Sequence, residues 1–495
     1  MRQCRIIVRD EVNCQLKDLE LNTRNKLVKK FSYEIPGARF MPAFKLGRWN
    51  GKENFFSLGG STFINLLPEI LPILIEEGYD FEVDDNRSYQ RSFNFDPISQ
   101  TSFDNRSWPV GHPIAGQPIL LRDYQVDAIN AFLREPQSLQ ELATGFGKTI
   151  TTAAMSATVE KYGRSLVIVP NKSLVTQTES DYINMGLDVG VYFGDRKEVH
   201  KTHTICTWQS LNVLANNPDK EEATFRLLKN PTNFTIQDLV DGTVCIIVDE
   251  VHMAKANALK TLLTGPFARI PIRWGLTGTI PKEEYAFKSI QCSLGNVIGQ
   301  LSARELQEEG HLAQCHVNIV QLVDHAAFGN YQSELKYLVG DLDRLATIAN
   351  LINNIKASGN TLVLVDRISA GKELLSYLGD SAVFVSGATK ASDRKEEYDE
   401  IATSTDKIII ATYGVAAVGI NVPRLFNIVM VEPGKSFTRV IQTIGRGLRK
   451  AADKNEVTIW DITSNCKFSK RHLTKRKQYY KEAQYPFSLE KLEWK

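Results

Sequence analysis

The segment ATGFGKT at residues 143–149 is the most direct indication of the fold of this chain. It lies between a short run that could be a strand (138–142) and a helix-forming run (151–157). A glycine-rich turn between a strand and a helix exposes successive backbone N–H groups, and the positive helix end strengthens their attraction for phosphate. We therefore expect a phosphate-binding loop, although Leu142 stands where the full pattern has a further glycine.

The residues of this loop suit a nucleoside triphosphate with its metal ion. In such loops the lysine reaches the β- and γ-phosphates, and the following hydroxyl holds Mg²⁺. We predict that ATP is bound by Thr144, Gly145, Gly147, Lys148 and Thr149, with Thr149 also holding Mg²⁺. Taken alone, the short GxGKT pattern could instead be a helix-capping turn.

A second motif follows about a hundred residues later, a typical interval for one nucleotide-binding domain. The continuous apolar run 244–248 predicts a buried parallel strand, and it ends in Asp249-Glu250-Val251-His252. Carboxylates at the carboxyl edge of a parallel strand face the crevice where nucleotides bind. We predict that Asp249 holds Mg²⁺ and that Glu250 orients and deprotonates the attacking water. An isolated motif of this kind could be a solvated turn.

A third motif, QTIGRGLR at residues 442–449, predicts a basic helix. Arg446 and Arg449 are three residues apart, which places both on one helix face. Phosphoryl transfer needs positive charge on the γ-phosphate as it leaves, and arginine can supply it. We take Gln442, Arg446 and Arg449 as catalytic candidates beside Lys148 and Glu250. The alternative is an ordinary basic helix surface.

These motifs, in this order, resemble those of superfamily 2 helicases and translocases, and the resemblance extends over residues 120–450. The segment LRDYQ at residues 121–125 resembles the adenine-recognising element, which implies that Arg122 and Gln125 bind the nucleotide. Further segments resemble helicase motifs: 166–174, 206–211, 275–279, 361–367 and 411–423. The resemblance implies an α/β fold of two RecA-like lobes, each a doubly wound parallel sheet, with ATP and Mg²⁺ between them.

The resemblance also implies roles outside these motifs. Gly419 would bind the nucleotide, while His252 and Thr277 would couple ATP hydrolysis to nucleic-acid binding. Simple strand-end capping is the alternative for Thr277. Candidate contacts to the nucleic-acid backbone are Pro170, Lys172, Thr207, Gln209 and Thr412. The family often has Asp where Asn421 stands, which leaves selectivity for the sugar open.

The net charge of +2 is small, so nucleic-acid binding must come from local patches. Near the N-terminus, aromatic residues interleave with Arg39, Lys45, Arg48 and Lys52, a pattern that suits backbone contact with base stacking. The run 467–481 is basic and has no acidic residue. It could equally be a solvated helix face.

A chain of 495 residues is too long for one core and suggests about three domains. We predict an α/β module that binds duplex or branched DNA at 1–95, a linker at 96–117, and lobes at 118–325 and 326–495. Within the module we expect strands at 4–8 and 79–83, helices at 16–31 and 68–78, and a hairpin region at 49–61.

The cysteines and the apolar stretches argue for a protein of the reducing cytoplasm. None of the seven cysteines forms a CxxC pair, so neither a disulfide framework nor a zinc site is expected. No signal peptide is expected, and the most apolar stretch, 64–75, is too short and interrupted to span a bilayer.

The exact residues of two motifs indicate which groups of superfamily 2 this chain resembles. Asp-Glu-Val-His with GLTGT at 275–279 fits restriction-enzyme motor subunits, XPB-type repair helicases and UvsW-like helicases of tailed phages. Segments 31–34, 37–40, 42–45 and 47–52 resemble the start of the UvsW-like proteins. That resemblance implies a phage-encoded helicase that acts in the host cytoplasm. It would remodel replication forks, Holliday junctions and R-loops in recombination, repair and replication. Because an R-loop contains an RNA–DNA hybrid, such hybrids would be among its substrates.

Two alternatives stay open at this point. One is a duplex DNA translocase that serves a restriction or nuclease partner. The other is an ATP-gated clamp or annealing protein, which would turn over slowly and would not displace strands.

Lys148→Ala is expected to abolish ATP turnover and to leave DNA binding largely intact, because this lysine contacts phosphates of the nucleotide in such loops. A steady-state ATPase assay and a gel-shift assay on the same preparation check both halves. Normal hydrolysis by this variant would contradict the phosphate-loop assignment.

Overall fold

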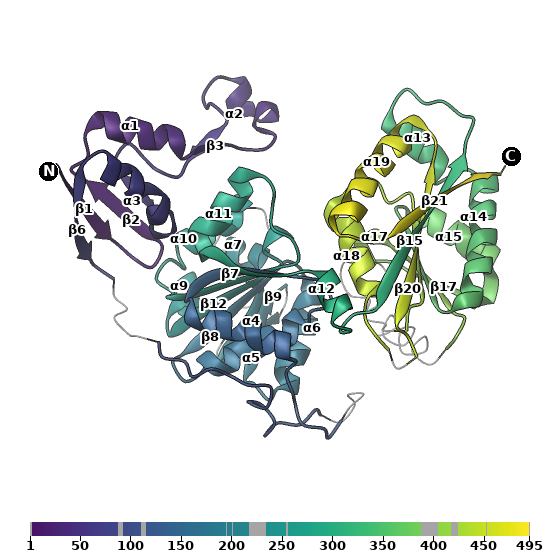
Figure 1. The fold of residues 1–495 in the computed structure, drawn as a ribbon, viewed down its shortest axis with the longest axis horizontal. Coiled ribbons are helices and arrows are strands. Elements are labelled where there is room, and N and C mark those ends of the chain that lie inside the picture. The colour runs from purple at the N-terminus through teal and green to yellow at the C-terminus, as the bar shows by residue number, and fades with distance from the viewer. Residues whose placement is uncertain are drawn as a thin grey trace. The chain divides into compact units, whose positions relative to one another are not determined.

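The computed structural model describes residues 2–87, 93–109, 115–194, 196–199, 201–216, 234–253, 256–387, 404–416, 424–451 and 453–494. The chain divides into two compact units (Figure 1). Unit 1 comprises residues 1–142 and 147–300, and unit 2 comprises residues 143–146 and 301–495. No helix in the described ranges is long and apolar enough to cross a membrane. All seven cysteines are buried and free.

Unit 1 begins with a small α/β module. Its sheet has the strand order β5-β2-β1-β6, with β1 antiparallel to β2 and parallel to β6. The strands are β1 (Arg2–Val8), β2 (Asn13–Lys17), β5 (Ser61–Phe63) and β6 (Tyr79–Asp85), and the main helices are α1 (Leu21–Lys30) and α3 (Leu67–Glu76). Alternate residues of β1, namely Cys4, Ile6 and Val8, are buried, which gives the sheet one core-facing side.

Two predictions within this module are wrong. The helix expected at 16–31 starts at Leu21, because residues 13–17 alternate in burial and form β2. The hairpin expected at 49–61 does not form: β4 (Lys52–Asn54) pairs with β3 (Ser32–Glu34), whereas β5 pairs with β2. Gly60 permits the second pairing, since its φ is +82° and an added Cβ would lie 2.0 Å from the Leu16 carbonyl oxygen.

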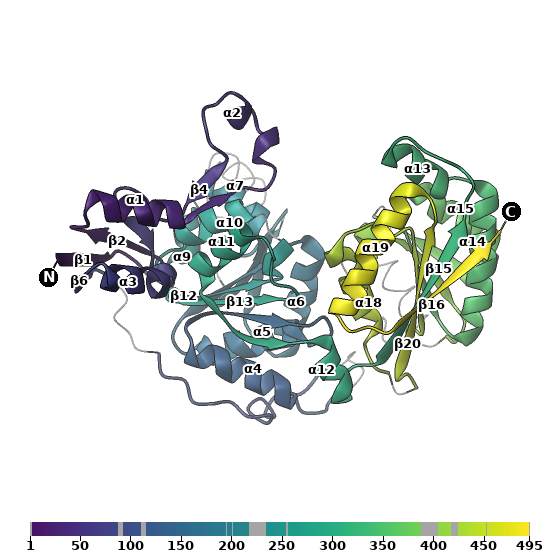
Figure 2. The ribbon, with the colours of Figure 1, turned by 45° about the horizontal axis from the view of Figure 1, so that its top comes forward.

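The rest of unit 1 is a doubly wound sheet of eight strands in the order β10-β9-β11-β8-β12-β13-β7-β14. Figure 2 shows its strands β12 and β13 side by side. The central pairs from β9 to β7 are parallel. The strands are β7 (Gln137–Leu142), β8 (Arg164–Val169), β9 (Val189–Phe193), β10 (Arg196–Lys197), β11 (His203–Thr207), β12 (Thr243–Asp249), β13 (Ile272–Thr277) and β14 (Asn296–Leu301). All seven residues of β12 are buried, as expected of a central parallel strand.

Helices cover both faces of this sheet (Figure 1). One group is α4 (Asp123–Arg134), α5 (Lys148–Val159) and α6 (Lys172–Asn184); the other is α7 (Trp208–Asn216), α9 (Ile236–Val240), α10 (Ala256–Thr264) and α11 (Glu284–Leu294). The second group packs its apolar residues on the sheet in one cluster that includes Leu211, Leu239, Leu263 and Leu294.

Unit 2 is a second doubly wound sheet, of seven parallel strands in the order β17-β18-β16-β19-β20-β15-β21. Its strands are β15 (Gln314–Val323), β16 (Thr361–Val365), β17 (Ala382–Val385), β18 (Ile408–Thr412), β19 (Asn427–Val431), β20 (Glu456–Ser464) and β21 (Phe487–Glu493). Its helices are α12 (Ala303–Glu308), α13 (Tyr331–Leu338), α14 (Leu342–Ile355), α15 (Ile368–Leu378), α17 (Tyr413–Ala416), α18 (Phe437–Gly447) and α19 (Lys467–Glu482). The predicted fold class is confirmed: two RecA-like lobes and a small N-terminal α/β module.

The predicted division between the lobes at residue 325 falls too late. Residues 314–323 form β15, which pairs with β20 and β21 in the sheet of unit 2. The two compact units divide near residue 300. A strand's own sequence carries no signal for which of two similar sheets it joins. The range predicted as a linker contains no helix or strand in its described residues.

The basic run near the C-terminus is helix α19, and one of its faces is built into unit 2. Ser469, Leu473, Arg476 and Tyr480 are buried along this face. The Arg476 guanidinium donates to both carboxylate oxygens of buried Asp461 at 2.8 and 2.9 Å, and the Tyr480 hydroxyl donates to the same carboxylate at 2.7 Å. Part of this basic run is therefore structural.

Arg476→Met is expected to lower the free energy of unfolding by about 3–5 kcal/mol, because it leaves the buried Asp461 carboxylate without its cation. Urea unfolding followed by circular dichroism measures the loss. Arg471→Met, the same change on the exposed side of the same helix, should shift stability by no more than about 0.5 kcal/mol. Equal effects of the two variants would contradict a structural role for Arg476.

Candidate active site

The phosphate-loop segment joins β7 to α5 as the sequence predicts. Gly147 is the N-terminal cap of α5 with φ +91°, and Gly145 has φ +93°, a backbone region that favours glycine. A Cβ on Gly147 would lie 2.6 Å from Nε2 of Gln125. A larger residue at this position would therefore strain the backbone and displace the glutamine amide.

Lys148, the first residue of α5, is buried at the end of the sheet. Its ammonium group donates to the Leu142 carbonyl oxygen at 3.1 Å and lies 3.2 Å from Oε1 of Glu250. The structure thus brings together the cation of the first motif and a carboxylate of the second. Thr149 follows Lys148 in the first turn of α5.

Asp249 and Glu250 stand at the carboxyl end of β12. Burial and the neighbouring Glu250 charge raise the pKa of Asp249 to about 7, against the opposing effect of Lys148. Burial also acts to raise the pKa of Glu250, but Lys148, His252 and the Gly278 N–H, 3.2 Å from Oε2, together lower it below its ordinary value. Glu250 is therefore ionised at neutral pH. Its backbone is held at φ +50°, a costly conformation for a non-glycine residue.

A hydrogen-bonded chain runs from His252 into the loop after β13. Nδ1 of His252 lies 2.7 Å from Oγ1 of Thr277, and that hydroxyl donates to the Thr279 carbonyl oxygen at 2.8 Å. Because the hydroxyl proton is committed to Thr279, Nδ1 of His252 must carry a proton and donate it. Burial lowers the pKa of His252, so the ring is neutral with Nε2 unprotonated. Nδ1 also lies 3.5 Å from Oε2 of Glu250.

The residues predicted to recognise adenine lie at the start of α4. Oε1 of Gln125 accepts from the Arg122 N–H at 3.0 Å and so caps the helix. Nε2 of the same side chain is the group that lies against Gly147. The Arg122 guanidinium donates to the Tyr124 hydroxyl at 2.6 Å.

The third motif lies in unit 2 and is only partly described. Gly419, Asn421 and the side chains of Gln442 and Arg446 fall outside the described residues. Helix α18 ends at Gly447, so Arg449 lies beyond it, and the prediction that Arg446 and Arg449 share one helix face is wrong. Thr144 and Gly145 group with unit 2 by their contacts.

Lys454 is a residue of this region that the sequence did not reveal. Its ammonium group is buried and donates to the carbonyl oxygens of Gly447 at 2.5 Å and Arg449 at 2.9 Å. It thereby satisfies carbonyl groups that the end of α18 leaves without helical partners. In the sequence, the surrounding segment AADKN (451–455) has the composition of a polar turn. Only the tertiary packing shows that the Lys454 side chain points inward.

The predicted backbone contacts of unit 1 lie at one edge of its sheet. Pro170 directly follows β8, and Thr207 is the last residue of β11, the neighbouring parallel strand. Nε2 of Gln209 donates to the Pro170 carbonyl oxygen at 3.1 Å, and Lys172 begins α6. Thr412 ends β18 in the sheet of unit 2.

The four cations of the N-terminal patch lie on an excursion between β3 and β4, which we call the arm (residues 35–51), and on β4 itself. The arm contains the short helices η1 (Ala38–Phe40) and α2 (Pro42–Lys45). Arg39, Lys45, Arg48 and Lys52 are exposed, and none forms an ion pair with a residue of the described ranges. Phe40 is 80% exposed and Leu46 64% exposed on the same arm.

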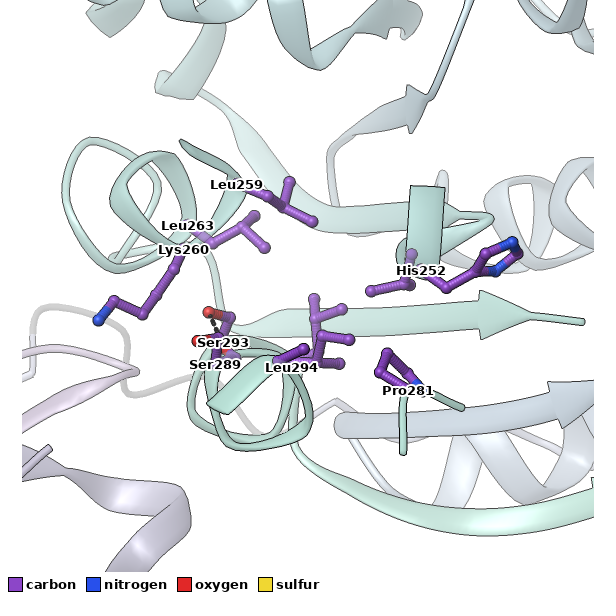
Figure 3. Close-up of a pocket in the computed structure, with 11 residues that line it drawn as sticks. His252, Leu259, Lys260, Leu263, Pro281, Ser289, Ser293 and Leu294 are labelled. Carbon is purple, nitrogen blue, oxygen red and sulfur yellow. Dashed lines mark hydrogen bonds between the residues drawn. The ribbon is translucent and has the colours of Figure 1, made fainter. Parts of the chain in front are cut away.

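A small cavity of about 30 Å³ lies beside His252, between α10 and α11 (Figure 3). Its lining includes Leu259, Leu263, Pro281 and Leu294, and Lys260 points away from the His252 end. The volume admits one water-sized molecule and no nucleotide. The cavity is a packing gap next to the Asp249–His252 segment. The candidate ligand site is the edge of the sheet that carries the phosphate loop.

Two family descriptions match separate parts of this chain. Residues 118–282 match the family described as "Type III restriction enzyme, res subunit", and residues 343–451 match the "Helicase conserved C-terminal domain". A solved structure titled "ATP-dependent Type ISP restriction-modification enzyme LlaBIII bound to DNA" aligns with a TM-score of 0.57 at 14% identity, over 87% of this chain and 36% of that chain. That likeness is one of fold.

The chain is an ATP-dependent helicase that belongs to superfamily 2. It is similar to the "ATP-dependent DNA helicase uvsW" of Enterobacteria phage T4, at 24% identity over 93% of this chain and 91% of the relative. It is also similar to the "DNA 3'-5' helicase XPB" of Mycobacterium tuberculosis, at 22% identity over 74% of this chain and 65% of the relative.

Asp249→Asn is expected to stabilise the metal-free protein above pH 7, with an effect that shrinks as the pH falls from about 7 towards 4. The reason is that the folded-state pKa of Asp249 is raised, so its buried charge destabilises the fold only where it is ionised. Thermal melts in EDTA across this range measure the difference. Asp84→Asn, on the exposed part of β6, is the control. A stabilisation that grows on acidification would contradict the assignment.

Proposed function

We propose that this ATP-dependent DNA helicase remodels branched DNA by Holliday-junction branch migration and fork regression. The observation that carries the proposal is the exposed basic arm, which is fixed to the same unit that holds Lys148 and Glu250. The similarity to the phage T4 relative, which covers 93% of this chain, supports it.

Lys148 and Glu250 carry the chemistry in this proposal. The ammonium group of Lys148 binds the β- and γ-phosphates, and Arg446 and Arg449 of the third motif neutralise the charge that builds on the γ-phosphate. The ionised Glu250 takes a proton from the attacking water, and the Gly278 N–H fixes the orientation of its carboxylate. Gln125 and Arg122 contact the base, and Thr144, Gly145, Gly147 and Gly419 complete the nucleotide site.

Mg²⁺ fits the donor set of Thr149 and Asp249. A hydroxyl and a buried carboxylate are the oxygen ligands that this ion prefers, and a nearby cation would offset the burial that raises the pKa of Asp249. When bound with ATP, Mg²⁺ supplies charge neutralisation at the β- and γ-phosphates.

His252 and Thr277 act as positioning residues between hydrolysis and movement. His252 donates to Thr277, whose hydroxyl donates in turn to the Thr279 carbonyl oxygen in the loop after β13. Glu250 accepts directly from the Gly278 N–H of the same loop, so a displacement of Glu250 during hydrolysis reaches that loop through this hydrogen bond. Pro170, Lys172, Thr207 and Gln209 of unit 1, with Thr412 of unit 2, contact the DNA backbone and shift along it in each cycle.

The N-terminal module is held firmly against unit 1's large sheet, which lets the arm act on a junction while the motor moves. Glu53 of β4 accepts from Lys260 of α10 and, at 2.8 Å, from the Tyr285 hydroxyl of α11. The Lys260 ammonium also lies 4.5 Å from the centre of the Phe55 ring. Arg39, Lys45, Arg48 and Lys52 bind phosphates of duplex DNA at the junction.

The wild-type chain is expected to convert a labelled synthetic four-way junction into forked products in the presence of ATP. Glu250→Gln, which keeps the shape of the side chain, should lose turnover by about 10² to 10⁴-fold and should convert none, because it removes the general base. Gel electrophoresis of the products measures the conversion.

Two other outcomes would overturn the proposal in distinguishable ways. Strong DNA-stimulated ATPase without conversion would indicate a duplex translocase that serves a partner. Slow turnover with no strand displacement would indicate an ATP-gated clamp.

A further inference from the structure

Helix α19 has two faces with different chemistry. Its buried stripe is anchored in unit 2 through Leu473, Arg476 and Tyr480. The opposite side exposes five cations: Lys467, Lys470, Arg471, Lys475 and Lys481. Lys470 and Arg471 follow Lys467 by three and four residues, and Lys475 follows Arg471 by four. This spacing places side chains along one side of a helix, and Lys481 lies about four turns beyond Lys467. From the first to the last, at about 1.5 Å per residue, they span roughly 21 Å.

These cations differ from those of an ordinary solvated helix. Exposed helices commonly pair lysine with a carboxylate three or four residues away. Residues 467–481 contain no acidic residue, and none of the five cations forms an ion pair with any residue that the structure describes. These cations therefore have no ion-pair partner among the described residues, and the phosphates of a polyanion could pair with them.

We propose that the exposed face of α19 binds the phosphate backbone of the DNA substrate. This inference rests on the proposed function, which supplies DNA as the ligand. A protein partner fits less well, because interfaces are built around buried aromatic and aliphatic residues. No large hydrophobic side chain of α19 is exposed. Five cations on a single helical face match a strand of regularly spaced phosphates.

The buried side of α19 connects this surface to the third motif. Nη1 of Arg476 donates to the Gly434 carbonyl oxygen at 2.6 Å, and the Tyr479 hydroxyl donates to the Lys435 carbonyl oxygen at 3.0 Å. These carbonyls belong to the turn before α18, whose first turn is capped by Ser436. DNA bound to α19 is therefore linked, through these two hydrogen bonds, to the start of α18, the helix that contains Arg446.

The test compares Lys470→Gln/Lys475→Gln with a control pair, Lys372→Gln/Lys491→Gln, in the full chain. Both pairs remove two exposed positive charges from unit 2. Lys372 lies on α15, on the opposite face of the sheet from α19 (Figures 1 and 2), and Lys491 lies on β21. The affinity for labelled single-stranded and duplex DNA is measured across a salt series, together with ATPase activity as a function of DNA concentration.

The test pair should reduce the slope of log affinity against log salt by roughly 1.4 for a single strand or 1.8 for a duplex, as expected for two lost phosphate contacts. A reduction seen with one probe and absent with the other identifies the form of DNA bound. The DNA concentration for half-maximal ATPase should rise, whereas basal ATPase and melting temperature should match the wild type. The control pair should leave the slope and the half-maximal DNA concentration unchanged.

Equal slopes for the test and control pairs, with junction conversion by the wild type intact, would overturn this inference alone. Failure of the wild type to convert junctions while it still binds DNA would overturn the proposed function alone. Absence of DNA binding by the wild type would overturn both.

Discussion

The ion pair between Lys148 and Glu250 is the contact on which the proposed site depends. It joins the first residue of α5 to the end of β12, two elements about a hundred residues apart in the chain. Asp249, Glu250 and His252 crowd into a buried space, and Lys148 is the cation among them. Buried carboxylates of like charge are unfavourable without such a cation. The same features that make this cluster costly for the fold suit it to phosphate and Mg²⁺.

From this cluster, two packed paths extend through unit 1. One runs through His252 and Thr277 into the loop after β13. The other follows α10 and α11, which flank the small cavity beside His252 and contact the N-terminal module through Lys260 and Tyr285. The arm and the proposed catalytic base therefore belong to one packed body. This arrangement gives a physical basis for acting on a branch point while ATP is hydrolysed.

Unit 2 shows how one helix can serve two purposes. The inner side of α19 satisfies Asp461 and holds the turn before α18, and these contacts require Arg476 to be buried. Its outer side keeps cations that no residue of the described chain neutralises. At the other end of α18, buried Lys454 holds the carbonyl groups of Gly447 and Arg449. Hydrogen bonds from the side chains of Arg476 and Lys454 to backbone carbonyl groups thus hold both ends of α18.

The sequence alone determined the two α/β lobes, the N-terminal module and the ATP-binding motifs. Local patterns suffice for these, because the glycine-rich turn, the buried strand before Asp249 and the order of the motifs are encoded in contiguous residues. Tertiary structure alone decided that β15 joins the second sheet and that β4 pairs with β3, since strand pairing depends on distant partners. It also decided that Arg476 and Lys454 point inward while Lys470 and Lys475 point out. A lysine or arginine in a basic run looks the same in sequence whether its charge is buried against a carbonyl or carboxylate or left to solvent, and only packing separates the two.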